Sequence, residues 1–303
     1  MKVAVIDLGT NTCNLLVAKI NDGGFEILHQ SKQLVRLGDD KIKTNEISPE
    51  ATSRAIKSFM AHSEIIRQFN VKKIRAIGTS AVRGAANKIE FLENIGDQTG
   101  CLVKVISGEK EAELIFRGAL LAVGEFRNPS VILDIGGGSN ELILAEKNEL
   151  IWKESRPTGM ARIINNFEIS DPITPEEISI LKNHFKEEHK NSFRECKTRK
   201  VKNLIGCSGA FDTIADIIDQ VDPGMKQRKT QEISMDDFYQ VYNKLLHSNR
   251  EKRIIMKGMD MVRVDLIVPA VILIETLIAE IGIETIVQTD FALREGILYE
   301  MIQ

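Results

Sequence analysis

Apolar residues in the first half of the chain alternate between the spacings of strands and of helices. Val3–Leu8 is a β-branched run that ends in the polar turn DLGTNT, the pattern of a buried strand that leads into a loop. Ser48–Asn70 keeps its apolar residues at helical spacing behind an N-cap serine and a proline in the first turn. The other predicted elements of this half are strands at Phe25–Leu28, Gln33–Leu37, Lys73–Gly78 and Leu102–Ile106, and helices at Ala81–Asp97 and Glu109–Val123.

The second half restarts with the layout of the first. VAVIDLGTNTCNLLVAKI and SVILDIGGGSNELILAEK both run from an apolar strand through an aspartate and a glycine-containing polar turn into a second apolar strand. Two such units, each near the start of a half of similar length, indicate a duplicated α/β lobe whose matching loops face one cleft. GEFRNPS interrupts the periodicity at Gly124–Pro129, which predicts lobes at 1–124 and 125–303.

The remaining elements of the second half follow from the same spacings. Pro157–Gly159 breaks the chain, and polar segments without an assigned element extend to Arg253. The helix at Asp265–Ile281 is almost wholly apolar, so it forms either core or a homodimer face. The other predicted elements are strands at Val131–Asp134, Glu141–Ala145, Leu150–Glu154, Val201–Ile205 and Thr285–Thr289, and helices at Pro175–Lys190, Ala210–Asp219 and Ala292–Met301.

Length and composition agree with a soluble protein of about two domains. The 303 residues are 43% hydrophobic and 27% charged, and 43 acidic residues face 40 basic ones. This balance gives no sign of a nucleic-acid partner, so a polyanion would need a local basic surface. The N-terminus lacks a signal peptide, and the longest apolar run, Leu266–Ala279, is too short to span a membrane. The cysteines are scattered, which favours reduced thiols in the cytoplasm: Cys13, Cys101, Cys196 and Cys207.

The two polar turns are the candidate chemical site. Glycine lets backbone N–H groups approach an anion, and a hydroxyl adds a further donor. Each turn follows a carboxylate, Asp7 or Asp134, which would repel a phosphate unless a hard cation such as Mg²⁺ lay between them. One turn alone would be an ordinary glycine turn, whereas the pair favours phosphate binding; neither turn is a Walker or dinucleotide motif. The candidate phosphate-binding residues of the turns are Gly9, Thr10, Asn11, Gly136, Gly137, Gly138 and Ser139.

Six segments together resemble the exopolyphosphatase/guanosine pentaphosphate phosphohydrolase (Ppx/GppA) family. They are, in order, DLGTNTCNLLVA, GTSAVRGAAN, ISGEKEAELIFRGAL, LDIGGGSNELIL, GCSGAFDTIAD and DFALREGIL. DIGGGSxEL combined with SGxxEAxLI is specific, and the resemblance covers nearly the whole chain. It implies an α/β fold of two actin-like (ASKHA, ribonuclease H-like) lobes with a cleft between them, in a short form without a C-terminal HD-type domain.

The resemblance also implies roles for individual residues. Glu111 matches the catalytic glutamate that activates the attacking water, although by itself it is an ordinary acidic residue in the first turns of a helix. Asp134 and Glu141 match the carboxylates that bind Mg²⁺. Arg83 matches a phosphate-binding arginine and is expected to open a helix after the turn Gly78–Ser80.

The implied activity is release of terminal orthophosphate from inorganic polyphosphate by metal-assisted attack of water. Two alternatives stay open: a pppGpp 5′-phosphohydrolase, and a non-catalytic alarmone- or polyphosphate-binding protein. A sugar or acetate kinase of the same fold is disfavoured by the motif around Glu111. RECKTRKVK, KQRK and REKR form either a solvated face or a track for polyphosphate, and Gly206 and Gly209 in GCSGAFDTIAD contact a nucleotide or are structural.

Overall fold

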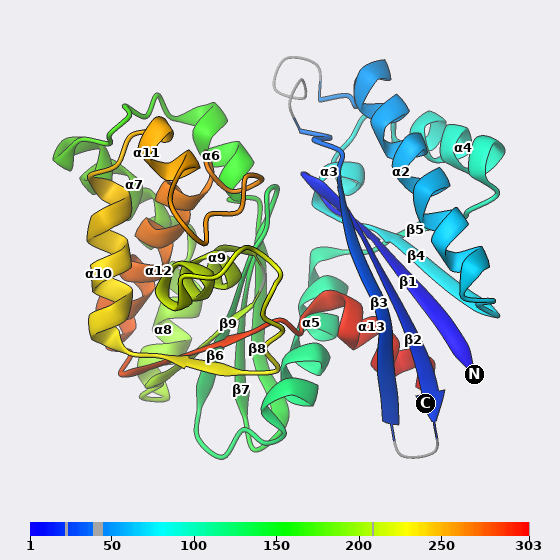
Figure 1. Ribbon diagram of the computed structural model, residues 1–303. Coiled ribbons are helices and arrows are strands. Elements are labelled where there is room, and N and C mark those ends of the chain that lie inside the picture. The colour runs from blue at the N-terminus through cyan, green and yellow to red at the C-terminus, as the bar shows by residue number, and fades with distance from the viewer. Residues whose placement is uncertain (22–23, 39–44, 208, 303) are drawn as a thin grey trace.

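Two β-sheets, one from each half of the chain, form the centres of two lobes that lie side by side (Figure 1). The computed structural model describes residues 1–21, 24–38, 45–207 and 209–302. The first sheet has the strand order β3-β2-β1-β4-β5. Its strands are β1 (Lys2–Leu8), β2 (Thr12–Asn21), β3 (Gly24–Leu34), β4 (Lys73–Gly78) and β5 (Val103–Val105).

The second sheet repeats the first in order and direction. Its order is β10-β11-β9-β6-β7-β8, in which β8-β7-β6-β9-β11 corresponds to β3-β2-β1-β4-β5. β1 and β6 each pair antiparallel with the next strand and parallel with β4 or β9. The strands are β6 (Ser130–Ile135), β7 (Asn140–Glu146), β8 (Glu149–Arg156), β9 (Asn203–Cys207), β10 (Gln231–Ile233) and β11 (Thr285–Thr289). The duplication inferred from the sequence is therefore confirmed.

Helices α2 (Pro49–Gln68), α3 (Ser80–Arg83) and α4 (Lys88–Thr99) belong to the first lobe. The predicted helix at 81–97 is wrong because the chain is interrupted between α3 and α4. Asn87 causes this interruption in part, since its side-chain oxygen accepts from Ile47 N and its side-chain nitrogen donates to Ile47 O, both at 2.9 Å. Strand β3 contains the strand predicted at 25–28 but only the first two residues of the strand predicted at 33–37, because β3 ends at Leu34.

The second lobe is built around an apolar helix. Helix α12 (Ile267–Ile281) is buried among its neighbours in this lobe, which makes it core rather than a homodimer face. Among the described residues, no helix has the length and apolar character needed to cross a membrane. The surrounding helices are α6 (Met160–Asn166), α7 (Pro175–Glu188), α8 (Lys190–Thr198), α9 (Gly209–Asp219), α10 (Met235–Leu246) and α11 (Arg250–Ile254).

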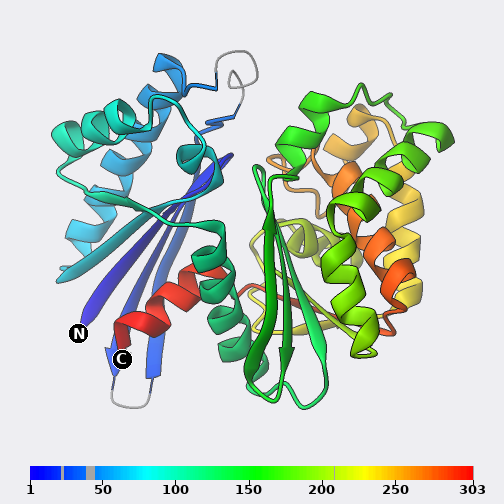
Figure 2. The same cartoon turned by 180° about the vertical axis from the view of Figure 1, so that it is seen from behind.

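Helices α5 (Gly108–Val123) and α13 (Leu293–Ile302) lie between the two sheets (Figures 1 and 2). They occupy equivalent places in the duplication, one after β5 and the other after β11. A Cβ on Gly118 would lie 1.9 Å from Ala292 O, and a Cβ on Gly296 would lie 1.8 Å from Leu114 O. Only glycine permits so close a crossing. The predicted division into lobes at residue 124 stays a prediction. Helix α13, which belongs to the predicted second lobe, packs on α5 and β1 of the predicted first lobe.

Candidate active site

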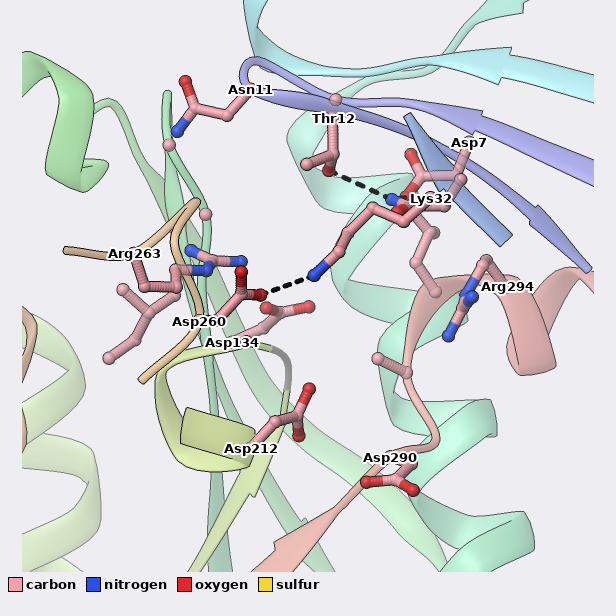
Figure 3. A pocket seen from close by; sticks show the side chains of 18 of the residues that line it. Asp7, Asn11, Thr12, Lys32, Asp134, Asp212, Asp260, Arg263, Asp290 and Arg294 are labelled. Atoms are coloured by element: carbon pink, nitrogen blue, oxygen red, sulfur yellow. Dashed lines mark hydrogen bonds and ion pairs between the residues drawn. The ribbon is translucent and has the colours of Figure 1, made fainter. Parts of the chain in front are cut away.

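The two loops that follow β1 and β6 have the same geometry and line one cleft of about 470 Å³ (Figure 3). Gly9 N donates to Thr12 O at 2.9 Å, and Gly136 N donates to Ser139 O at 3.0 Å. All the predicted loop residues line the cleft, as do Glu111, Asp134 and Glu141, whereas Arg83 does not. The lining of the cleft thus includes every predicted site residue except Arg83, which contacts Glu111.

Contacts with helix α6 fix the orientation of the second loop. The three carbonyl oxygens of the triple glycine accept from Met160 N, Ala161 N and Arg162 Nε at 3.0, 2.9 and 2.9 Å. In a trans peptide the N–H points opposite to the C=O, so the N–H groups of residues 137–139 point away from α6. Several N–H groups converging from one turn form a binding site for an anion.

The first loop is held in the same way by the segment after β3. Thr10 O accepts from Leu37 N at 2.7 Å, and Asn11 O accepts from Val35 N at 2.9 Å. The two loops also approach each other, because a Cβ on Gly138 would lie only 2.5 Å from Thr10 Oγ1. A phosphate group in this part of the cleft would therefore meet donors from both lobes.

Gly159 is a site-forming residue that the sequence did not reveal. It is the N-cap of α6, and a Cβ there would lie 2.4 Å from Gly137 C, Gly138 N and Ser139 N. Glycine is therefore required for α6 to approach the second loop and to orient its carbonyl groups. Sequence patterns indicated only a chain break at Pro157–Gly159, because the contact joins segments that are about twenty residues apart.

Four acidic side chains lie in and beside the loops: Asp7, Glu111, Asp134 and Glu141. Burial raises the pKa of Asp7 to about 6 and the pKa of Glu111 to about 7. Burial, followed by the charges of Glu111 and Asp134, raises the pKa of Glu141 well above its ordinary value. Such a concentration of buried carboxylates is destabilising unless a cation is present.

The residues fit a hard divalent cation held by few protein ligands. Asp134 and Glu141 are directly opposite each other in the β6–β7 register, and Glu141 Oε1 accepts from Ser155 Oγ at 2.7 Å. Asp7 Oδ1 is buried without a hydrogen-bond partner among the described residues. Within the described part of the chain, no three acidic, histidine or cysteine side chains form a complete metal-binding group. Mg²⁺ suits this arrangement because it commonly takes only one or two carboxylates, with water and phosphate oxygens completing its shell.

Arg83 holds Glu111 in place. Arg83 Nη1 donates to Glu111 Oε2 at 2.9 Å and to Ile106 O at 3.0 Å. The expectation that Arg83 opens a helix is wrong, because α3 begins at Ser80 and Arg83 is its last residue. Its predicted role in phosphate binding stays a prediction, and its contacts indicate that it positions Glu111.

A buried polar network supports the second loop from behind. Asn140 Nδ2 donates to Thr158 O at 2.6 Å, and Thr158 Oγ1 lies 3.3 Å from His189 Nε2. His189 is 0% exposed. Burial, followed by the charges of Arg156 and His184, lowers the pKa of His189 to about 3.

We expect His189 to make the protein acid-sensitive. In the unfolded chain it binds a proton below pH 6.5, its ordinary pKa, whereas in the folded protein it stays neutral down to about pH 3. The free energy of unfolding should therefore fall on acidification, by at most about 1.4 kcal/mol per pH unit from this group. Urea unfolding at pH 7.5 and pH 5 should show a smaller acid-induced loss for His189→Gln than for wild type. Equal losses would contradict the role of His189.

Ion pairs neutralise many of the lysine and arginine side chains in the three basic clusters, RECKTRKVK, KQRK and REKR. Arg228 in KQRK is 4% exposed and pairs with Asp216 at 2.8 Å and with Asp219 at 2.6 Å. Arg253 in REKR is also buried and pairs with Asp171 at 2.8 Å. Neither arginine can belong to an exposed polyphosphate track. Other basic residues of the clusters are paired too: Lys197 with Glu280, Lys202 with Glu284, Lys226 with Asp219, and Arg250 with Asp265.

Packing explains the two glycines of GCSGAFDTIAD. A Cβ on Gly206 would lie 2.1 Å from the Phe211 ring, and one on Gly209 would lie 2.3 Å from Arg263 Nη2. Ser208 lies outside the described residues. These contacts favour the structural alternative for both glycines.

The duplicated fold and the paired loops at one cleft are those of actin-like proteins. Within this class, residues 16–303 match the model of the Ppx/GppA phosphatase family. The chain therefore belongs to the Ppx/GppA phosphatase family.

Individual relatives agree over the full length. The chain is 27% identical to Exopolyphosphatase 2 of Mycobacterium tuberculosis, covering 98% of this chain and 97% of the relative. It is 26% identical to a putative exopolyphosphatase of Haemophilus influenzae, covering 99% and 91%. The crystal structure of an exopolyphosphatase from Cytophaga hutchinsonii is 34% identical, with a TM-score of 0.95 and coverage of 100% and 98%. An Aquifex aeolicus family member, 23% identical with a TM-score of 0.84 and coverage of 100% and 97%, shares the fold.

Proposed function

We propose that the protein is an exopolyphosphatase that releases terminal orthophosphate from inorganic polyphosphate. The observation that carries the proposal is the pairing of two anion-binding loops with the buried carboxylate of Glu111 in one cleft. The 34% identical relative described as an exopolyphosphatase supports the same substrate. The proposed location is the cytoplasm, where thiols stay reduced, and the four cysteines of the protein form no disulfide. A homodimer would have to use a surface other than α12.

In the proposed reaction, water attacks the terminal phosphorus opposite the bridging oxygen. Glu111 accepts the water proton, and a pKa of about 7 suits it to act as a base near neutral pH. Arg83 keeps the Glu111 carboxylate in one orientation. The N–H groups of both loops stabilise the charge on the transferred group, and a chain shorter by one phosphate leaves.

Asp134 and Glu141 would hold Mg²⁺, which would offset phosphate charge when bound. We expect orthophosphate release to stop in excess chelator and to return with Mg²⁺, because the carboxylates otherwise repel the substrate. Asp134→Asn should raise the Mg²⁺ concentration needed for activity and for Mg²⁺-dependent thermal stabilisation. Asp97→Asn, an exposed position on α4, is the control. Full activity of wild type in chelator would contradict the site.

Parallel assays of orthophosphate release from polyphosphate, pppGpp and ATP test the proposed substrate. We expect the highest kcat/KM for polyphosphate. A higher value for pppGpp would favour the nucleotide phosphohydrolase instead. Binding without turnover of any of the three would favour a non-catalytic protein.

A further inference from the structure

An ion pair joins the two lobes across the cleft. Lys32 on β3 forms an ion pair with Asp260, which lies between α11 and α12 (Figure 3). The distance from Lys32 Nζ to Asp260 Oδ2 is 2.5 Å. Both residues line the cleft that also contains the loops after β1 and β6. The Lys32 side chain is 48% exposed, so solvent and solutes can reach it.

The register of the first sheet directs Lys32 towards the loops. Lys32 pairs with Asn14, and Asn14 pairs with Asp7, so the three side chains lie in one row on one face. With strands about 4.8 Å apart, Lys32 begins about 10 Å to the side of Asp7. An ammonium group there would meet phosphates that follow the terminal one, rather than the group being transferred.

Among the described residues, the other cationic side chains that line the cleft are Lys226, Arg228, Arg263 and Arg294. Two of them are held by more than one side chain of their own lobe. Arg228 is buried against two aspartates, and Lys226 donates to Asp219 at 2.7 Å and to Gln231 at 3.1 Å. Lys32 has three N–H donors, and Asp260 takes one of them. Asp260 itself is held by its own segment, because its Oδ1 accepts from Val262 N at 3.0 Å.

We propose that Lys32 binds the substrate's phosphates beyond the terminal one, and that Asp260 competes with them for the same ammonium group. This inference rests on the proposed function. Lys32 thereby favours substrates with several consecutive phosphates, and Asp260 weakens their binding. The charges of the two residues determine whether each raises or lowers the affinity for substrate, because a phosphate chain must displace Asp260 before it pairs with Lys32.

A simple tie between the lobes is the rival explanation for the ion pair. In that case, removing either partner would loosen the same contact and change binding in the same direction. If Lys32 binds substrate, removing the two partners has opposite effects. Lys32→Met and Asp260→Asn therefore distinguish the two explanations.

The experiment measures KM and kcat for polyphosphate of defined length, and its Kd in the Glu111→Gln background. Lys32→Met should raise KM and Kd about tenfold, the effect of losing one charge-assisted hydrogen bond. Lys32→Arg should restore most of the affinity, and kcat should stay within about threefold throughout. Asp260→Asn should lower Kd several-fold, but should have no effect once Lys32 is Met.

Lys153→Met is the matched control, since Lys153 pairs with Glu113 and, at 3.5 Å, with Glu109 outside the cleft lining. It should leave Kd unchanged. Equal shifts for Lys32→Met and Asp260→Asn, or no shift for Lys32→Met, would overturn the inference. Failure of the wild type to hydrolyse polyphosphate would instead reject the proposed function, and the Kd values would still test Lys32.

Discussion

Glu111→Gln is expected to reduce orthophosphate release by about 10²–10⁴-fold, the usual effect of losing a general base. The amide keeps the shape of the side chain and can still accept a hydrogen bond from Arg83, but it cannot accept a proton from water. Substrate binding should remain nearly intact, because the loop N–H groups are unaffected. Single-turnover release of orthophosphate from polyphosphate measures the loss directly.

The stability of this variant should change little. Burial raises the pKa of Glu111, so its ionised form is disfavoured in the folded protein, and the neutral amide removes that cost. Loss of the charge also weakens the hydrogen bond from Arg83, which opposes the gain. Glu109→Gln is the control, because Glu109 is an exposed residue in the same first turn of α5. Activity of Glu111→Gln within a few-fold of wild type would reject Glu111 as the base.

The duplicated strand–loop–strand unit was predictable because the residues that indicate it are close together in the sequence. A β-branched run, an aspartate and a glycine turn occur in consecutive residues, and they occur twice. The register then places Asp134 beside Glu141 without any long-range information, since the hairpin of β6 and β7 fixes both. Both loops could therefore be predicted from local sequence, whereas Asp134 and Glu141 were indicated as metal ligands by the resemblance to the family, and that role stays a prediction.

Features that depend on distant segments were not predictable. Arg83 meets Glu111 only because α3 and α5 adjoin in the fold, and sequence spacing does not encode that contact. The basic clusters looked exposed because the carboxylates that pair with Arg228 and Arg253 come from other elements. Helix α10 was missed within a polar segment, although Ser234 as N-cap is a local signal that could have revealed it.

Gly159→Ala is expected to reduce kcat/KM by about 10²-fold, although residue 159 touches neither the cleft nor the proposed base. An added Cβ would lie 2.4 Å from three backbone atoms of the second loop, where ordinary contacts begin near 3.4 Å. The loop or α6 must therefore move by about 1 Å, a displacement that costs about 10²-fold when it misplaces a reacting group. Comparison of kcat/KM for polyphosphate between wild type and the variant tests this expectation.

Gly96→Ala separates this effect from the general effect of replacing glycine. Gly96 lies within α4, and a Cβ there would meet nothing closer than Leu102 Cδ2 at 3.9 Å. Alanine in a helix is favoured over glycine by about 0.5–1 kcal/mol, so Gly96→Ala should be slightly more stable and fully active. Gly159→Ala should lose activity while the protein stays folded, because the collision is confined to the loop. If Gly159→Ala retained wild-type kcat/KM, the loop would not need its contact with α6, and the orientation of its N–H groups would have another cause.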